Sequence, residues 1–283
     1  MIVDELKNIV AKSGQQNRTD LYTRSLLKEY LQIYVLNFIY LNPEYNRNFI
    51  FTGGTCLRRC FGLNRLSEDL DFDLETAVDA QAVKNGLSAY FKQTYLYNEL
   101  EIAVVQRGEQ ILLKFPVLKK LGLATDPESD LLYVKIDLSP VTSKIYEKYT
   151  TLNSTNNFNY IVTHYDPPSL MANKIVAILT RSRFQGKDNL EIIKGRDYFD
   201  LLWFIEKKVK PNIPRMNDLL KKQLSMSEIL GLLDAKVEKA VTTFRLEMQR
   251  DLLPFIDNPE IIKGYIEGYK SNYDFQKQYV LTV

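Results

Sequence analysis

The chain has 283 residues, 45% of them hydrophobic, which is enough to bury a sizeable core in one large domain or two packed ones. The 37 Lys and Arg residues nearly balance the 35 Asp and Glu residues, so the net charge is only +2. A strongly basic nucleic-acid-binding protein is therefore excluded, and any such partner must be held by a local basic patch. Acidic residues follow Met1 closely, and the apolar run 33–41 is shorter than the ~20 residues that cross a bilayer. We expect a cytoplasmic protein with no secretory leader and no membrane partner.

Cysteine and histidine are scarce. Cys56 and Cys60 are the only cysteines, and they lie four residues apart on one predicted helix, so we expect reduced packing residues and no disulfide framework. His164 is the only histidine, and a zinc site is therefore not expected.

Hydrophobic spacing predicts an α+β first half. Residues 27–41 follow the rhythm of an amphipathic helix that packs on a sheet, and Asn42-Pro43 ends it. Further helices are predicted at 55–61 and 80–95, and strands at 49–52, 69–74, 101–106, 110–115 and 131–138. Residues 123–130 have turn chemistry and predict an exposed loop.

A glycine pair follows the first predicted strand. Gly53 and Gly54 lack the Cβ atoms that would keep a triphosphate away from the backbone amides. The helix predicted from Thr55 would place its N-terminus beside such phosphates. Alone, a Gly-Gly after a strand is usually only a turn.

Alternating carboxylates mark the next strand. Because side chains alternate faces, Asp69, Asp71 and Asp73 would project from one side of it. Such oxygen ligands suit Mg²⁺, or Mn²⁺, together with substrate phosphates. An acidic strand can also be a solvated edge. The glycine turn, short helix and acidic strand in this order favour a phosphate cradle joined to a metal site.

These motifs resemble a known signature. The chain is similar to the AbiEii/MenT group in four motifs. Two lie close together, Gly53-Gly54-Thr55-x-Leu57 and Arg65-x-Ser67-x-Asp69-Leu70-Asp71. Two lie farther on, Lys174-x-x-Ala177-x-x-x-Arg181 and Arg196-Asp197-x-x-Asp200-Leu201. That group comprises nucleotidyltransferases of bacterial abortive-infection and toxin–antitoxin systems, within the DNA polymerase beta-like superfamily. The resemblance runs from about residue 29 to 202. Where the group's first helix often carries Lys, this chain has Arg58 and Arg59, and Arg is not an equivalent phosphate ligand.

The resemblance implies a toxin enzyme. It would transfer a nucleoside monophosphate from a nucleoside triphosphate to RNA, expected to be tRNA, and arrest growth in a toxin–antitoxin or phage-defence system. A cognate antitoxin would be encoded nearby. Motifs and resemblance together assign Asp69, Asp71 and Asp137 to metal binding, and these three with Lys174 to catalysis. The residues assigned to nucleotide binding are Gly53, Gly54, Thr55, Arg65, Ser67, Lys174 and Arg181. The residues assigned to supporting positions around the site are Arg59, Arg196, Asp197 and Asp200.

Asp137 interrupts the apolar strand 131–138, where a charge is costly unless it is paired or bound to a metal. In nucleotidyltransferases a third carboxylate on a neighbouring strand typically joins the Asp-x-Asp pair and can act as base toward the attacking hydroxyl. The alternatives are an edge-strand Asp or a partner for Lys135.

The segment Asp166-Pro-Pro-Ser169 marks a change to mostly helical sequence, with Ser169 as the expected helix cap. We therefore expect a catalytic domain at 1–165 and a helical domain at 166–283 that completes the active site. Lys174 and Arg181 lie about two turns apart and share a face with the small Ala177 between them, which leaves room for the triphosphate. The alternative is a solvated basic face.

A further helix is predicted to begin at Gly195. Asp197 lies in its first turn and Asp200 on the same face, where they could orient Lys174, or Arg196 and Asp200 could form a helix-surface pair. Residues 183–189 are expected to form a mobile basic loop that contacts RNA. The Tyr- and Lys-rich stretch 263–273 either stacks bases or forms an ordinary amphipathic surface.

Regulation and two rival functions remain open. Phosphorylation of Ser67 would add negative charge and block triphosphate binding, unless Ser67 is a turn residue that bonds its own backbone. One rival function is a small-molecule nucleotidyltransferase of the aminoglycoside-modifying type, for which an acidic pocket is expected. The other is a binding or immunity protein that has lost turnover.

Overall fold

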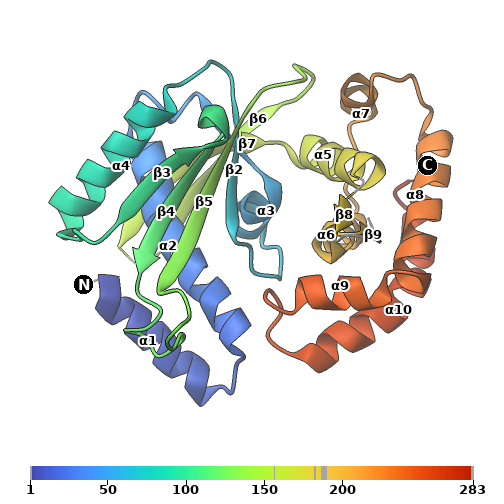
Figure 1. The fold of residues 1–283 in the computed structure, drawn as a ribbon. Coiled ribbons are helices and arrows are strands. Elements are labelled where there is room, and N and C mark those ends of the chain that lie inside the picture. The colour runs from blue at the N-terminus through green and yellow to red at the C-terminus, as the bar shows by residue number, and fades with distance from the viewer. Residues whose placement is uncertain (1, 156, 182, 186–189, 282–283) are drawn as a thin grey trace. The chain divides into compact units, whose positions relative to one another are not determined.

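The computed structural model describes residues 2–155, 157–181, 183–185 and 190–281, with the backbone alone for 183–185 and 190–192. Two compact units make up the chain (Figure 1). The first comprises Met1–Val141 and Lys148–His164, and the second comprises Thr142–Glu147 and Tyr165–Val283.

The first unit is built on a mixed sheet, which has seven strands within the described residues. Its helices are α1 (Ile2–Gln15), α2 (Asp20–Leu41), α3 (Gly53–Phe61) and α4 (Ala80–Tyr95). Its strands are β1 (Phe49–Thr52), β2 (Asp69–Leu74), β3 (Glu101–Val105), β4 (Gln110–Pro116), β5 (Leu131–Pro140), β6 (Lys148–Thr155) and β7 (Phe158–Tyr165), with the 3₁₀ turn η1 (Gln106–Gly108) between β3 and β4. The α+β prediction is confirmed, although α1, β6 and β7 were not among the predicted elements.

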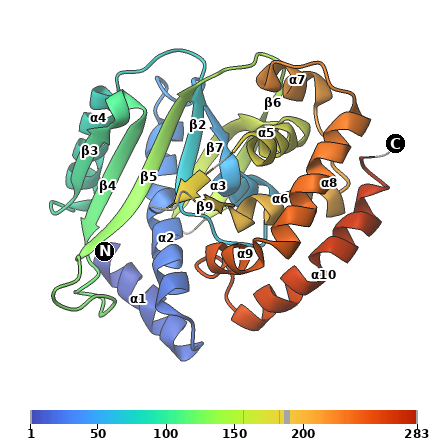
Figure 2. The ribbon, with the colours of Figure 1, turned by 45° about the vertical axis from the view of Figure 1, so that its right-hand side comes forward.

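The strand order is β3-β4-β5-β2-β1-β7-β6. β2 lies between β1, to which it is antiparallel, and β5, to which it is parallel. β5 also pairs with β4, so it is an interior strand and the edge-strand alternative for Asp137 is wrong. α2 and α4 cover one face of the sheet (Figures 1 and 2).

The alternation along β2 fixes which of its side chains face the core. Leu70 and Phe72 are buried, and the Phe72 ring stacks on Phe51 of β1 with centroids 5.2 Å apart. Burying aromatic side chains of this size is worth roughly 1.5–3 kcal/mol each. A shift of β2 by one residue would expose these rings and bury the carboxylates, so the core fixes the face on which Asp69 and Asp71 lie.

The second unit is mostly helical, as predicted. Its helices are α5 (Pro167–Thr180), α6 (Gly195–Glu206), α7 (Ile213–Leu220), α8 (Met226–Thr242), α9 (Arg245–Leu252) and α10 (Pro259–Lys277), and its strands β8 (Arg183–Gln185) and β9 (Leu190–Ile192) form a hairpin. The cap of α5 is Asp166, whose carboxylate accepts a hydrogen bond from the Ser169 N–H. The prediction of Ser169 as the cap is therefore wrong.

Two tyrosines of α10 belong to the core of this unit. Tyr269 is buried and donates a hydrogen bond to the carbonyl oxygen of Tyr198, and Tyr273 donates one to Asp234. These two rings are therefore not available to stack on bases. None of the described helices has the length and apolar character needed to span a membrane.

Candidate active site

The predicted carboxylates of the first unit lie on two paired strands. The parallel register of β2 and β5 sets Asp71 opposite Asp137 and Asp69 opposite Lys135. Registered residues project to the same side of a sheet. Asp69, Asp71, Asp137 and Lys135 therefore lie on the face that is turned away from Leu70 and Phe72.

Lys135 stands between two of these carboxylates. Its Nζ lies 3.1 Å from Asp69 Oδ2 and 2.9 Å from Asp137 Oδ2. The other oxygen of Asp137, Oδ1, accepts a hydrogen bond of 2.7 Å from the side chain of Gln110 on β4. The alternative pairing of Asp137 with Lys135 is thus present, and Gln110 is a site residue that the sequence motifs did not reveal. Gln110 lies directly opposite Asp137 in the register of β4 with β5, and this pairing is not visible in the sequence.

The carboxyl group of Asp69 has a perturbed pKa. Burial raises its pKa above the usual value, and the nearby Lys135 ammonium opposes this shift. The side chain is thus partly withdrawn from water, where a cation is held more strongly than at an open surface.

The glycine pair makes room for the chain's own side chains. Gly53 has φ +74°, and a Cβ atom there would lie 2.0 Å from Asp71 Oδ2. A Cβ on Gly54 would lie 2.6 Å from Arg65 Nη2 and 2.9 Å from Ser67 Oγ. Gly53 and Gly54 therefore bring Asp71, Arg65 and Ser67 directly against the start of α3.

The other predicted residues of this turn are held by internal contacts. Thr55 is fully buried and its hydroxyl donates to the carbonyl oxygen of Asp69, so a phosphate could be contacted only by its backbone N–H. Thr52, the N-cap of α3, makes no side-chain cap hydrogen bond. Arg65 is buried and donates to the Leu66 carbonyl oxygen at 2.8 Å. Ser67 is also buried, which argues against its phosphorylation in the folded protein.

The two arginines of α3 both contact Glu29 of α2. Arg58 Nε lies 3.0 Å from the Glu29 carboxylate, and Arg59 Nη2 donates to the Glu29 carbonyl oxygen. These contacts join α3 to α2 and hold Arg59 in place.

The carboxylates suit a metal by chemistry, although they do not form a ready cluster. Among the described residues, no three His, Cys, Asp or Glu side chains are grouped closely enough to hold a metal ion. Asp69, Asp71 and Asp137 nevertheless offer the oxygen donors that Mg²⁺ and Mn²⁺ prefer, from adjacent strands and on one face. Their donor chemistry thus fits such an ion, while the ammonium of Lys135 lies between Asp69 and Asp137.

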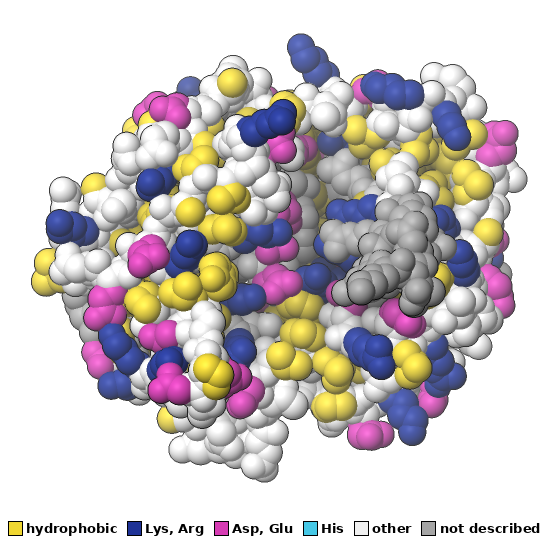
Figure 3. All heavy atoms as spheres, viewed as in Figure 1, with side chains coloured by type: hydrophobic (Ala, Val, Ile, Leu, Met, Phe, Trp, Pro, Cys, Tyr) yellow, Lys and Arg dark blue, Asp and Glu magenta, His cyan; other side chains and the backbone are white. Residues whose placement is uncertain are grey.

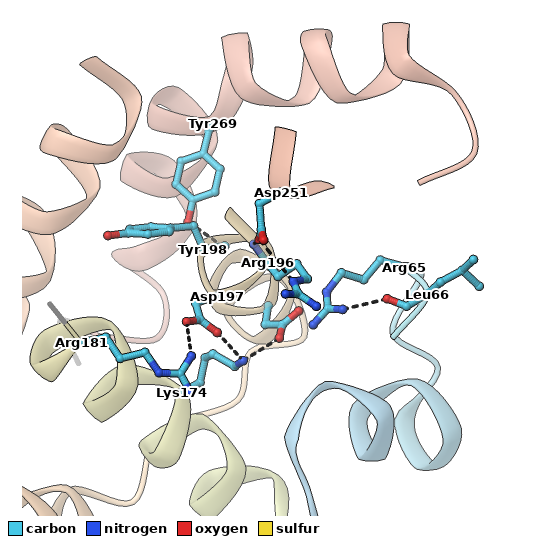
Figure 4. A network of polar contacts seen from close by, with 10 residues as sticks. Arg65, Leu66, Lys174, Arg181, Arg196, Asp197, Tyr198, Asp251 and Tyr269 are labelled. Carbon is cyan, nitrogen blue, oxygen red and sulfur yellow. Dashed lines mark hydrogen bonds and ion pairs between the residues drawn. The ribbon is translucent and has the colours of Figure 1, made fainter. Parts of the chain in front are cut away.

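The second unit holds a different arrangement around Lys174. Its Nζ lies 2.8 Å from both Asp197 Oδ1 and Asp200 Oδ2, and Arg181 Nη1 lies 2.7 Å from Asp197 Oδ2. Figure 4 shows Lys174 and Arg181 directed from α5 toward Asp197 on α6. The predicted common face of Lys174 and Arg181 is confirmed, and the solvated basic face is wrong for Lys174, which is largely buried.

Charge pairing keeps the carboxylate of Asp197 ionised. Burial alone would raise the pKa of Asp197, but Lys174 and Arg181 hold it well below its usual value. Asp200 has no exposed surface, so it does not lie on a solvated helix surface. Arg196 binds Asp251 through its backbone N–H and Nε (Figure 4). Its guanidinium lies 4.4 Å from the Phe255 ring centroid.

Two neighbouring cavities of the second unit are basic. The smaller is lined by Ala177, Ile178, Arg181, Ile193, Lys194, Asp197, Tyr198, Lys236, Lys239 and Phe244. The larger, of about 420 Å³, is lined by Leu179, Thr180, Leu220, Lys222, Leu224, Leu232, Ala235, Lys236 and Lys239. Both include Lys236 and Lys239 of α8, so one basic strip follows this helix.

The basic strip is a local feature. On the face shown in Figure 3, Lys and Arg side chains are interspersed with Asp and Glu side chains. The structure describes only part of the loop 183–189, which is expected to contact RNA. Residues 183–185 form β8, and residues 186–189 lie outside the described part of the chain.

Comparisons with known proteins give one family and a common fold. Residues 38–270 match the family described as nucleotidyl transferase AbiEii toxin, type IV toxin–antitoxin system. MenT4, a nucleotidyltransferase toxin from Mycobacterium tuberculosis, has a similar structure at 13% identity and TM-score 0.50, covering 98% of this chain and 94% of that one. JHP933 from Helicobacter pylori is similar at 14% identity and TM-score 0.51, covering 90% and 93%. No curated protein sequence matches the chain.

Proposed function

The chain belongs to the AbiEii family of nucleotidyl transferase toxins, and from this premise we propose that it transfers a nucleoside monophosphate from a nucleoside triphosphate to RNA, with tRNA as the acceptor. The observation that carries the proposal is the set of carboxylates on β2 and β5 beside the glycine turn of α3. Membership of a toxin–antitoxin family also supports an antitoxin partner and arrest of growth when the enzyme is unrestrained. A role in phage defence is proposed on the same basis.

Asp69, Asp71 and Asp137 would hold the divalent ion, Mg²⁺ or Mn²⁺. When bound, the ion would offset negative charge on the triphosphate at the reacting phosphorus. Asp71 is positioned for this by Gly53, because no larger residue leaves space for its carboxylate at the start of α3.

The protein's own groups position the substrates. Backbone N–H groups at the start of α3 would bind triphosphate oxygens, helped by the positive end of the helix dipole. We infer that Lys174 supplies positive charge to a triphosphate, and its pairing with Asp197 and Asp200 fixes the ammonium in one position.

The transfer itself is a displacement at the α-phosphorus. The acceptor hydroxyl oxygen forms a bond to that phosphorus, the bond to the bridging oxygen breaks, and pyrophosphate leaves. Asp137 would accept the proton of the hydroxyl. The side chain of Gln110 donates a hydrogen bond to its carboxylate and orients it.

The basic cavities of the second unit favour RNA over a cationic drug as acceptor. Arg181, Lys194, Lys222, Lys236 and Lys239 line them, against Asp197 alone. Phosphate backbones bind to such groups, whereas a polycationic aminoglycoside requires an acidic pocket. A protein that only binds would not require the carboxylates of β2, and this favours turnover.

Four parallel reactions test the proposal, each with total bacterial RNA, Mg²⁺ and one nucleoside triphosphate labelled at its α-phosphate. We expect label in a discrete RNA band with the intact protein and none with the Asp69→Asn, Asp71→Asn double variant. Label on a small molecule with no labelled RNA would favour the aminoglycoside-type reaction. Absence of any transfer by folded protein that binds a triphosphate would contradict the proposal.

The acceptor site is tested separately by a Lys236→Gln, Lys239→Gln variant. We expect the KM for RNA to rise by about tenfold or more at moderate salt, because two phosphate contacts are lost, while the KM for the triphosphate stays unchanged. A Lys92→Gln variant on α4 is the control, since Lys92 is exposed and lines neither cavity. An unchanged KM for RNA in the double variant would exclude the basic strip as the acceptor site.

A further inference from the structure

We propose that Lys135 is an internal counter-cation of the carboxylate site, which holds Asp69 and Asp137 together in the metal-free protein and leaves its place when a divalent ion binds. This inference rests on the proposed metal site and adds the residue that competes for it. It assigns to Lys135 a positioning role through the carboxylates and no contact with the reacting atoms.

The Lys135 ammonium and a divalent ion would occupy the same position between Asp69 and Asp137. Lys135 Nζ is within 3.1 Å of oxygens from both Asp69 and Asp137. A magnesium ion requires its oxygen ligands at about 2.0–2.1 Å and in nearly octahedral directions. An ion coordinated by these carboxylates would need the volume that the ammonium fills, so the two cannot occupy it together.

The charge of the site shows why the exchange is favourable. Asp69, Asp71 and Asp137 carry three negative charges and Lys135 supplies one positive charge, which leaves these four side chains with two negative charges. One ammonium thus restrains the carboxylates without neutralising them. A divalent ion supplies the larger charge and draws the oxygens closer than an ammonium can.

The lysine is also able to leave. The side chains of Lys135, Asp69 and Asp137 are 30%, 26% and 30% exposed, so all three are in contact with water. A flexible four-carbon stem allows the ammonium to move outward at low energetic cost. The released charge would remain close enough to attract an incoming triphosphate.

Competition predicts an unusual effect of deleting a positive charge. A Lys135→Met protein should bind Mn²⁺ at least about tenfold more tightly than the wild type in the absence of nucleotide, measured by electron paramagnetic resonance titration of free Mn²⁺. Lys114→Met is the matched control. Lys114 lies on β4, two residues from Leu112, the register partner of Lys135, and its removal should change the dissociation constant little.

The result separates this inference from the metal site itself. If Mn²⁺ binds to the wild type and is lost in Asp71→Asn, the metal site stands, and equal or weaker binding by Lys135→Met then overturns the counter-cation role. If Mn²⁺ does not bind to the wild type at all, the proposed metal site fails and the inference with it. Lys135→Gln provides the same comparison should the methionine variant not fold.

A measurement on the unaltered chain provides an independent test. Brief acetylation followed by mass spectrometry reports how accessible each amine is, and we expect the labelling of Lys135 to rise several-fold when Mn²⁺ is added. Lys114 should not respond. Unchanged labelling of Lys135 at saturating Mn²⁺ would mean that the ammonium stays between the carboxylates, contrary to the proposal.

Discussion

The two units each contain a lysine held between two aspartates, and the two arrangements differ in burial and charge balance. On the sheet, Lys135 lies between Asp69 and Asp137 at a partly exposed surface. In the helical unit, the side chain of Lys174 is 13% exposed, Asp197 is 8% exposed and Asp200 has no exposure. The same residue types thus form one partly exposed and one buried ion cluster.

Charge balance accounts for the difference. Lys174 and Arg181 match Asp197 and Asp200 one for one, so that cluster has no need of a further cation. The sheet site has three carboxylates for one lysine. Burial then makes the balanced cluster expensive to disturb, because a single deletion leaves an unpaired charge away from water. The comparison supports a fixed position for Lys174 within the helical unit, and it supports the proposed exchange of cations at the sheet carboxylates.

The largest expected effect is the loss of nucleotide transfer when a sheet carboxylate is removed. Asp71→Asn should reduce nucleotide transfer by about 10³-fold, because a ligand that offsets charge at phosphorus contributes several kcal/mol to the transition state. The free energy of unfolding should stay within about 1 kcal/mol of the wild type, since the carboxylate lies outside the core. The check is the single-turnover rate beside a urea denaturation curve. Retention of more than a tenth of the rate would remove Asp71 from the metal site.

Removing the lysine of the buried cluster should cause a large loss of stability. Lys174→Met leaves Asp197 and Asp200 buried without their lysine and should lower the free energy of unfolding by about 3–5 kcal/mol. Lys135→Met, the matched deletion at the exposed pair, should lower it by about 1 kcal/mol or less. Urea denaturation of both variants gives the two values. Equal losses would break the distinction between a fixed and an exchangeable lysine.

The glycine turn tests whether the position of Asp71 depends on the space beside Gly53. Gly53→Ala must accommodate φ +74° and a methyl group 2.0 Å from the Asp71 carboxylate, so we expect a loss of about 1–3 kcal/mol in stability and a large loss of transfer activity. Gly268→Ala in α10 is the control, because a Cβ there has no neighbour within 4 Å. It should instead stabilise the protein by roughly 0.5–1 kcal/mol. Thermal unfolding of the two proteins separates these outcomes.

The smallest effect expected is a pH dependence confined to the helical cluster. Lys174 and Arg181 hold the pKa of Asp197 below its unfolded value of about 3.9, despite the opposing effect of burial. The ionised carboxylate therefore stabilises the folded state above about pH 4, and this contribution is lost as the pH falls toward the lower folded pKa. The stability difference between wild type and Asp197→Asn should be constant near pH 6 and shrink below pH 4. A difference that stays the same between pH 6 and pH 3 would contradict the assignment.

Local patterns were sufficient to predict the elements that carry the site. Alternation in Asp69–Leu74 predicts β2 and its acidic face, and helical spacing predicts that Lys174 and Arg181 point the same way. β7 was missed although Phe158, Tyr160 and Val162 alternate as buried residues, and β6 was missed because its residues are mostly polar. β-branched Thr residues were the remaining signal there.

The pairings across the chain could not be predicted. The contact between Asp69 and Lys135 depends on the parallel register of β2 with β5, which the intervening helix and hairpin determine. The same holds for Glu29 with Arg59 and for Asp251 with Arg196, because each joins residues that are distant in sequence. Such contacts follow from tertiary packing, and local periodicity carries no information about them.

A crystal structure of the protein with Mn²⁺ and a non-hydrolysable nucleoside triphosphate would test the central claim most directly. We predict an anomalous difference peak coordinated by Asp69 and Asp71, with Lys135 Nζ displaced from Asp69 and Asp137 and with Lys174 still bound to Asp197 and Asp200. A peak at the Lys174 cluster, or Mn²⁺ on the sheet carboxylates with Lys135 unmoved, would contradict the account.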